Sequence, residues 1–105
     1  PVRDVAGMLR SFHYAAYSGL IARSPENQPL TEWAEAWSRL AGETFVQNWQ
    51  EATRGAAFIP PNERDLQTLL DAFLLEKALY EVNYELNNRP QWLPTPLRGV
   101  LALLE

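Results

Sequence analysis

Six side chains with the chemistry of a sugar-binding site lie close together between residues 77 and 92. They combine aromatic rings with charged groups, and they are Lys77, Tyr80, Glu81, Tyr84, Arg89 and Trp92. Aromatic rings cover the apolar face of a pyranose, while carboxylate, ammonium and guanidinium groups form charge-assisted hydrogen bonds with its hydroxyls. The first four recur at helical spacing, so we expect them on one face of a helix. We interpret this stretch as a candidate carbohydrate-binding surface.

The same residues also allow a purely structural interpretation. Lys77 and Glu81 are four residues apart and could form a surface ion pair that stabilises the helix by about 0.2–0.5 kcal/mol. The tyrosines could pack in a core with their hydroxyls at its rim, and Trp92 could anchor a turn. Residue spacing alone leaves both interpretations open.

Several classes of chemistry are excluded by what the 105-residue chain lacks. It has no cysteine and only one histidine, His13, which rules out thiolate metal sites, cysteine nucleophiles and paired-histidine metal sites. Its five glycines are isolated, so no phosphate-binding loop is present. The net charge of −4 argues against a nucleic-acid partner. No apolar run approaches about 18 residues, so we expect no membrane partner, and the lack of cysteine fits a cytoplasmic protein.

Apolar residues repeat with the period of a helix, and no strand pattern is visible. Helices are predicted at residues 4–22, 31–53, 62–88 and 95–104. Thr31, Asn62 and Thr95 are the expected N-caps, with Pro96 at the first helical position of the last helix. The fold class is therefore all-α, a helical bundle of three long helices plus a short C-terminal helix in a single (sub)domain.

Helical spacing also predicts which side chains face inward. The first helix has stripes on two sides, and we expect so short a chain to leave one of them uncovered. The predicted stripes are Val5, Met8, Leu9, Phe12, Ala16 and Leu20, with Arg10, Tyr14, Tyr17 and Ile21 opposite; Trp33, Trp37, Leu40, Ala41 and Thr44; Leu66, Leu69, Leu70 and Phe73; and Leu97, Val100, Leu101 and Leu104. Residues 56–61 are expected to form an extended linker.

Two segments resemble the C-terminal part of bacterial maltokinases, enzymes often fused to, or encoded near, trehalose synthase. They are RDVAGMLRSFHYAA (residues 3–16) and FLLEKALYEVNYELNNRPQWLPTPLRGVL (residues 73–101). The two motifs cover about two fifths of the chain and occur in the order expected for the family. The chain departs from the family at His13, where we expect an aspartate.

The resemblance implies an aminoglycoside-phosphotransferase-like and protein-kinase-like fold, with this chain as the helical part of the C-lobe. Family members transfer the γ-phosphoryl of ATP to the anomeric hydroxyl of maltose, using magnesium and an aspartate that takes the hydroxyl proton. The catalytic aspartates precede the RDVAGM motif in the family, so this chain would be a C-terminal fragment without them. ATP and Mg²⁺ would then be held outside it. The implied partners are maltose, the kinase N-lobe and catalytic core, and trehalose synthase.

The resemblance also carries the sugar-binding role over to the same six residues. The charged side chains would hold sugar hydroxyls, the tyrosines would pack on the glucose rings, and Trp92 would anchor the turn or serve as a sugar platform. The implied function is therefore the acceptor-binding helical portion of a maltokinase, inactive alone. The alternative is a non-catalytic helical module for protein interaction or regulation, which would expose apolar faces to a partner.

Overall fold

The computed structural model describes residues 1–23 and 28–104, and within these ranges it contains helices and no strand. The elements are α1 (Val2–Arg23), α2 (Gln28–Ala52), α3 (Glu63–Asn88), the 3₁₀ turn η1 (Pro90–Trp92) and α4 (Pro94–Leu104). The predicted all-α bundle of three long helices and a short C-terminal one is confirmed.

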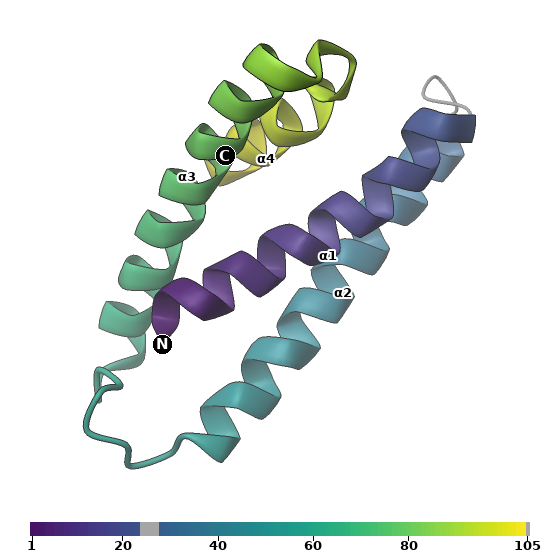
Figure 1. The fold of residues 1–105 in the computed structure, drawn as a ribbon. Helices are drawn as coiled ribbons and strands as arrows, with labels where there is room; N and C mark the ends of the chain where they lie inside the picture. Colours follow the sequence, from purple (N-terminus) through teal and green to yellow (C-terminus); the bar gives the residue numbers. More distant parts are fainter. Residues whose placement is uncertain (24–27, 105) are drawn as a thin grey trace.

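Helix α1 is the central element, and helices of the same chain cover it on both sides. It packs on α2 along one side and on α3 and α4 along the other, while α2 and α3 diverge from a shared loop (Figure 1). The expectation that one side of the first helix would stay uncovered is therefore wrong. Helix α4 folds back against both α3 and α1. In the second stripe of α1, Arg10 and Tyr17 are buried and Tyr14 is half-buried, whereas the side chains of Ile21 and of Leu20 in the first stripe lie outside the described part of the chain.

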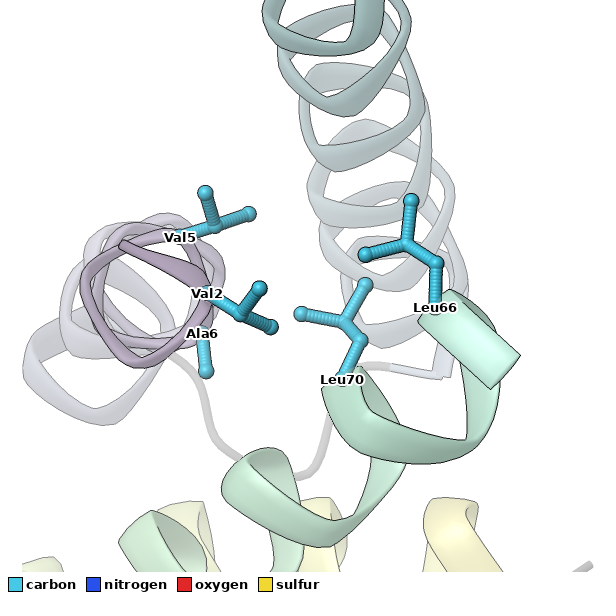
Figure 2. Packing of buried hydrophobic residues seen from close by; sticks show 5 residues of the cluster. All are labelled: Val2, Val5, Ala6, Leu66 and Leu70. Carbon is cyan, nitrogen blue, oxygen red and sulfur yellow. The ribbon is translucent and has the colours of Figure 1, made fainter. Parts of the chain in front are cut away.

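The hydrophobic core lies where the first turns of α1 meet the first turns of α3. Five buried side chains form it: Val2, Val5, Ala6, Leu66 and Leu70 (Figure 2). Half-buried residues of α2, among them Phe45 and Trp49, pack against this cluster. Further along α1, Tyr17 packs with Ala34 of α2 in a second, smaller buried cluster. The core is thus small and divided, and it holds the helices together mainly at one end.

The helix termini follow the sequence rules in one case and depart from them in two. Asn62 caps α3 as predicted, since its side-chain oxygen accepts from Arg64 N at 2.8 Å. Thr31 is wrong as an N-cap because α2 begins three residues earlier, at Gln28. Thr95 is wrong for the same reason, because α4 begins at Pro94. In both helices a proline occupies the first turn, where its fixed φ and missing N–H suit a helix start.

The predicted inward stripe of α2 is wrong. Trp33 and Leu40 are 63% and 64% exposed, and it is Ala34 and Gly42 that lie buried against α1. A Cβ on Gly42 would lie only 3.1 Å from Leu9 Cδ2. Small side chains thus let the two helices approach closely, while Trp33 and Leu40 point outward.

Helix α4 likewise buries residues outside its predicted stripe and exposes leucines of that stripe. Its buried residues are Thr95, Pro96 and Gly99, whereas Leu101 and Leu104 are 62% and 71% exposed. Residues 56–61 are also not extended, because backbone hydrogen bonds fold them into turns, including one from Ile59 N to Ala56 O at 3.2 Å. Among the described residues no helix is both long and apolar enough to cross a membrane.

Candidate functional site

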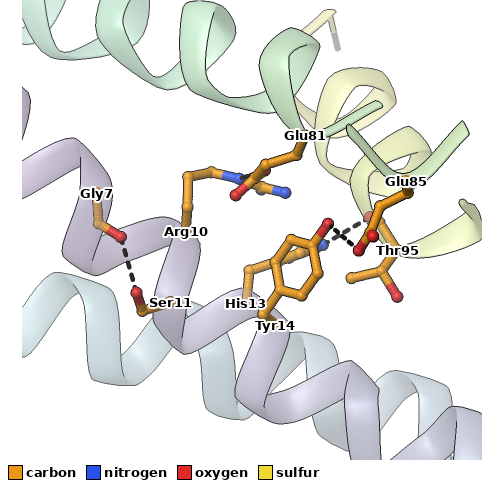
Figure 3. Close-up of polar contacts among 8 residues, drawn as sticks. All are labelled: Gly7, Arg10, Ser11, His13, Tyr14, Glu81, Glu85 and Thr95. Carbon is orange, nitrogen blue, oxygen red and sulfur yellow. Dashed lines mark hydrogen bonds and ion pairs between the residues drawn. The ribbon is translucent and has the colours of Figure 1, made fainter. Parts of the chain in front are cut away.

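A buried polar junction joins α1 to α3. Arg10 Nε donates to Glu81 Oε1 at 2.7 Å, and the two side chains are only 6% and 13% exposed. One turn further along each helix, the Tyr14 hydroxyl donates to Glu85 Oε2 at 2.9 Å (Figure 3). Removing one partner of a buried ion pair costs about 3–5 kcal/mol, because the other charge stays buried without compensation. These paired contacts therefore specify how α1 lies against α3.

His13 extends the junction from α1 to α4. Its Nε2 lies 3.0 Å from the Thr95 carbonyl oxygen, which can only accept a hydrogen bond, so Nε2 carries the proton. Burial, assisted by the nearby positive charge of Arg10, lowers the pKa of His13 to about 4. The imidazole is therefore neutral at pH 7. We use the name polar junction for the six residues Arg10, His13, Tyr14, Glu81, Glu85 and Thr95.

Burial also shifts the pKa values of other junction residues. It raises the pKa of the Glu81 carboxyl, an effect that outweighs the opposing attraction of Arg10. It raises the pKa of Tyr14 as well, and the hydrogen bond to Glu85 adds to the shift. Tyr14 accordingly stays a protonated donor at any ordinary pH.

Arg89 connects the polar junction to aromatic side chains at the end of α3. Its Nε and Nη2 donate to the two oxygens of Glu85 at 2.9 and 3.0 Å, a two-point fork. The guanidinium lies 4.4 Å from the ring centre of Trp92 and 5.7 Å from that of Tyr84. The hydrogen bond to Glu85 raises the pKa of Arg89. We call the group of Tyr84, Arg89 and Trp92 the aromatic stack.

Five of the six residues predicted for the site fall into two groups in the structure. Arg89 joins Tyr84 and Trp92 in the aromatic stack, and Lys77 lies with its Nζ 5.4 Å from the ring centre of Tyr80, which is 61% exposed. Glu81 is turned away from both groups and pairs with Arg10 of α1. The suggested surface ion pair between Lys77 and Glu81 is therefore wrong.

Of the six polar-junction residues, only Glu81 was among the predicted site residues, and Arg10, Tyr14 and Glu85 are three that were missed. A signal for them is present in the spacing. Arg10 and Tyr14 are four residues apart, as are Glu81 and Glu85, so two helices in parallel register can join one pair to the other. Arg10 and Tyr14 belong to the predicted second stripe of the first helix, and these carboxylates are its hydrogen-bond partners.

One hollow in the described part of the molecule lies away from these residues. It is an open groove of about 660 Å³ between α2 and the α3–α4 pair, with α1 as its floor. Arg10 and His13 reach it from the polar junction, but none of the six predicted site residues lines it. The candidate sugar surface is therefore an exposed flank of α3 and η1, and not a cavity.

No protein-family model matches this chain. Among the described residues, no group of three or more histidine, aspartate and glutamate side chains is placed to hold a metal ion.

Proposed function

We propose that this chain is the C-terminal helical portion of a maltokinase and that it contributes acceptor-sugar binding. The observation that supports this proposal is that the two segments resembling the family, residues 3–16 and 73–101, pack on each other through the polar junction. Each of its three hydrogen-bonded pairs joins one segment to the other.

In this proposal the exposed flank of α3 and η1 binds maltose. The rings of Tyr80, Tyr84 and Trp92 would pack on the apolar faces of the glucose units, and Lys77 would donate to a hydroxyl. The fork to Glu85 uses two of the five N–H donors of a guanidinium, so Arg89 keeps three for sugar hydroxyls. Glu81 would not contact the sugar, and its ion pair with Arg10 would hold α1 against this helix.

The proposal assigns the phosphoryl-transfer chemistry to kinase residues outside this chain. ATP, Mg²⁺ and the aspartate that takes the hydroxyl proton would belong to the N-lobe and catalytic core. This chain would bind and orient the acceptor, and alone it would not phosphorylate maltose. Trehalose synthase, fused or associated, remains a proposed partner. A kinase-like aspartate motif is expected just upstream of this chain in the parent gene, and its absence would contradict the proposal.

The direct test is a maltose titration of the 105-residue chain followed by ¹H–¹⁵N NMR of its tryptophan indoles. Maltose is raised above about 10 mM, tenfold beyond the usual upper range of KM values. We expect the Trp92 signal to shift, and Tyr84→Ala to abolish the shift. Trp33 on α2 is 63% exposed and serves as the internal control for nonspecific stacking. Equal shifts of Trp33 and Trp92, or none, would count against the proposal, and the β-linked isomer cellobiose tests specificity.

A second candidate function is a non-catalytic module for protein interaction or regulation. It is favoured by large apolar side chains that are more than half exposed on α2 and α4, namely Trp33, Leu40, Leu101 and Leu104. The rest of a kinase would cover such faces, but so would an unrelated partner. Two results together would favour this module: a parent gene that encodes no kinase lobe, and a Trp92 signal that does not shift when maltose is added.

A further inference from the structure

We infer that Glu85 is the positioning residue of the sugar surface: it holds the Arg89 guanidinium in place over Trp92. The inference rests on the proposed function and adds a residue that the six predicted contacts do not include. Glu85 is fully buried, at 0% exposure, so it cannot touch a sugar itself. Its effect on binding would have to pass through the side chains that it orients.

The geometry between Glu85 and Arg89 constrains position as well as charge. Both carboxylate oxygens accept from the guanidinium, at 2.9 and 3.0 Å, and such a fork fixes the plane of the group. The Arg89 side chain is 43% exposed, so without the fork it would sample many rotamers. Within the fork it lies 4.4 Å from the Trp92 ring centre.

Tyr14 joins the same carboxylate to α1. Its hydroxyl donates to Oε2 of Glu85, the same oxygen that accepts from Arg89 Nη2. Three hydrogen bonds thus hold one carboxylate, two from Arg89 and one from α1. Glu85 thus has two separate sets of contacts: the Tyr14 hydrogen bond joins it to α1, and the two hydrogen bonds from Arg89 hold the guanidinium.

Glu85 could also serve only to fasten α1 to α3, and the two roles predict different mutant behaviour. Tyr14→Phe removes the hydrogen bond between α1 and Glu85 and leaves the fork between Glu85 and Arg89 intact. Glu85→Gln keeps the size of the side chain but leaves one oxygen, so the fork is lost. Arg89→Lys keeps a positive charge beside Glu85 but cannot make a two-point contact.

The experiment measures the Arg89 Nε–H and Trp92 indole signals of the 105-residue chain, first without sugar and then during a maltose titration. We expect Glu85→Gln to displace both signals before any sugar is added, and to weaken maltose binding about tenfold or more. Arg89→Lys should weaken maltose binding to a similar degree. Tyr14→Phe should lower the melting temperature but leave the maltose affinity near that of the unmutated chain.

Each result decides the matter. Unchanged Arg89 and Trp92 signals in Glu85→Gln, or an equal loss of maltose affinity in Tyr14→Phe, would overturn the positioning role while leaving the proposed function intact. If Glu85→Gln does not fold, Arg89→Lys decides, and normal maltose affinity in that variant overturns the role. If the unmutated chain itself ignores maltose, the proposed function fails and the inference fails with it.

Discussion

Gly99 is the position at which the polar junction leaves no room for a side chain. A Cβ there would lie 2.7 Å from Arg10 Nη2 and 2.8 Å from Arg10 Cζ. The guanidinium cannot move aside freely, because it is buried and bonded to Glu81. We expect Gly99→Ala to lower the free energy of unfolding by about 1–3 kcal/mol, measured by urea denaturation.

Gly7→Ala is the matched control for this substitution. Gly7 is also helical, and a Cβ there would meet nothing within 4 Å. Replacing glycine by alanine in a helix favours folding by about 0.5–1 kcal/mol when space permits. The two variants should therefore change stability in opposite directions, and a stabilising Gly99→Ala would show that Arg10 is not held as described.

His13 should make stability depend on pH below neutrality. The pKa falls from the ordinary 6.5 to about 4 on folding, so the unfolded chain binds the proton more readily. The stabilisation is complete above pH 6.5 and is lost as the pH falls toward about 4. We expect the free energy of unfolding to drop by about 2–3 kcal/mol through this residue over that range.

The control variant is His13→Gln, whose amide can still donate to the Thr95 carbonyl but does not titrate. Carboxylate groups titrate in both proteins, so the difference between the two pH profiles isolates His13. The difference should widen steadily as the pH is lowered. Parallel profiles would mean that the imidazole is not buried as a neutral group.

At the scale of the helix, the N-cap of α3 is a local device that can be tested alone. The Asn62 side chain accepts from Arg64 N at 2.8 Å, which satisfies one of the free N–H groups of the first turn. We expect Asn62→Ala to destabilise the protein by about 1 kcal/mol in thermal or urea unfolding. Asn48→Ala is the control, because Asn48 lies exposed inside α2 and alanine is the better helix former there. Equal effects at both positions would contradict a capping role.

The positions of the helices could be predicted from the sequence, whereas the faces that they bury could not. Helix existence and the ends of α3 depend on local signals: periodicity, the Asn62 cap and the proline after Arg89. The buried face depends on the partner helix, and periodicity shows that a stripe repeats but not that it points inward. In α2 the small residues Ala34 and Gly42 face α1, so the prominent tryptophan stripe misled the prediction.

The candidate site likewise has a part that could be predicted from the sequence and a part that could not. Its aromatic and charged residues were recognisable because their types and spacing are local properties of α3. The direction of Glu81 was not, because it is set by Arg10, a partner 71 residues away. Glu85 was overlooked because a glutamate in a polar helix looks solvent-exposed until α1 and Arg89 enclose it. Long-range pairing therefore limits what the pattern can show.

On the scale of the whole molecule, much apolar surface remains uncovered. The chain is elongated, with extents of 44 × 28 × 21 Å, and its buried core residues are few. On α4, Leu101 and Leu104 are 62% and 71% exposed, and on α2, Trp33 and Leu40 are 63% and 64% exposed. Exposed apolar side chains that gather into a large patch are typical of a surface that contacts another protein.

The isolated chain should therefore associate with itself in a concentration-dependent manner. We expect sedimentation equilibrium to show species larger than the 12.0 kDa monomer at high concentration. Replacing both Leu101 and Leu104 by Gln should shift the distribution toward the monomer. Because these side chains are already exposed, the stability of the monomer should change by no more than about 0.5 kcal/mol per site.

Leu70→Gln separates loss of contact surface from loss of folding. Leu70 is 6% exposed in the core, so this variant should unfold and expose more apolar surface, not less. If the α4 substitutions leave the distribution of monomer and larger species unchanged, the contact lies on the α2 face instead. Trp33→Gln tests that face in the same way. If both variants and the unmutated chain are monomeric at every concentration, the apolar faces are not self-complementary. They would then have to be covered by a surface of different shape, which is what both the kinase and the interaction-module proposals require.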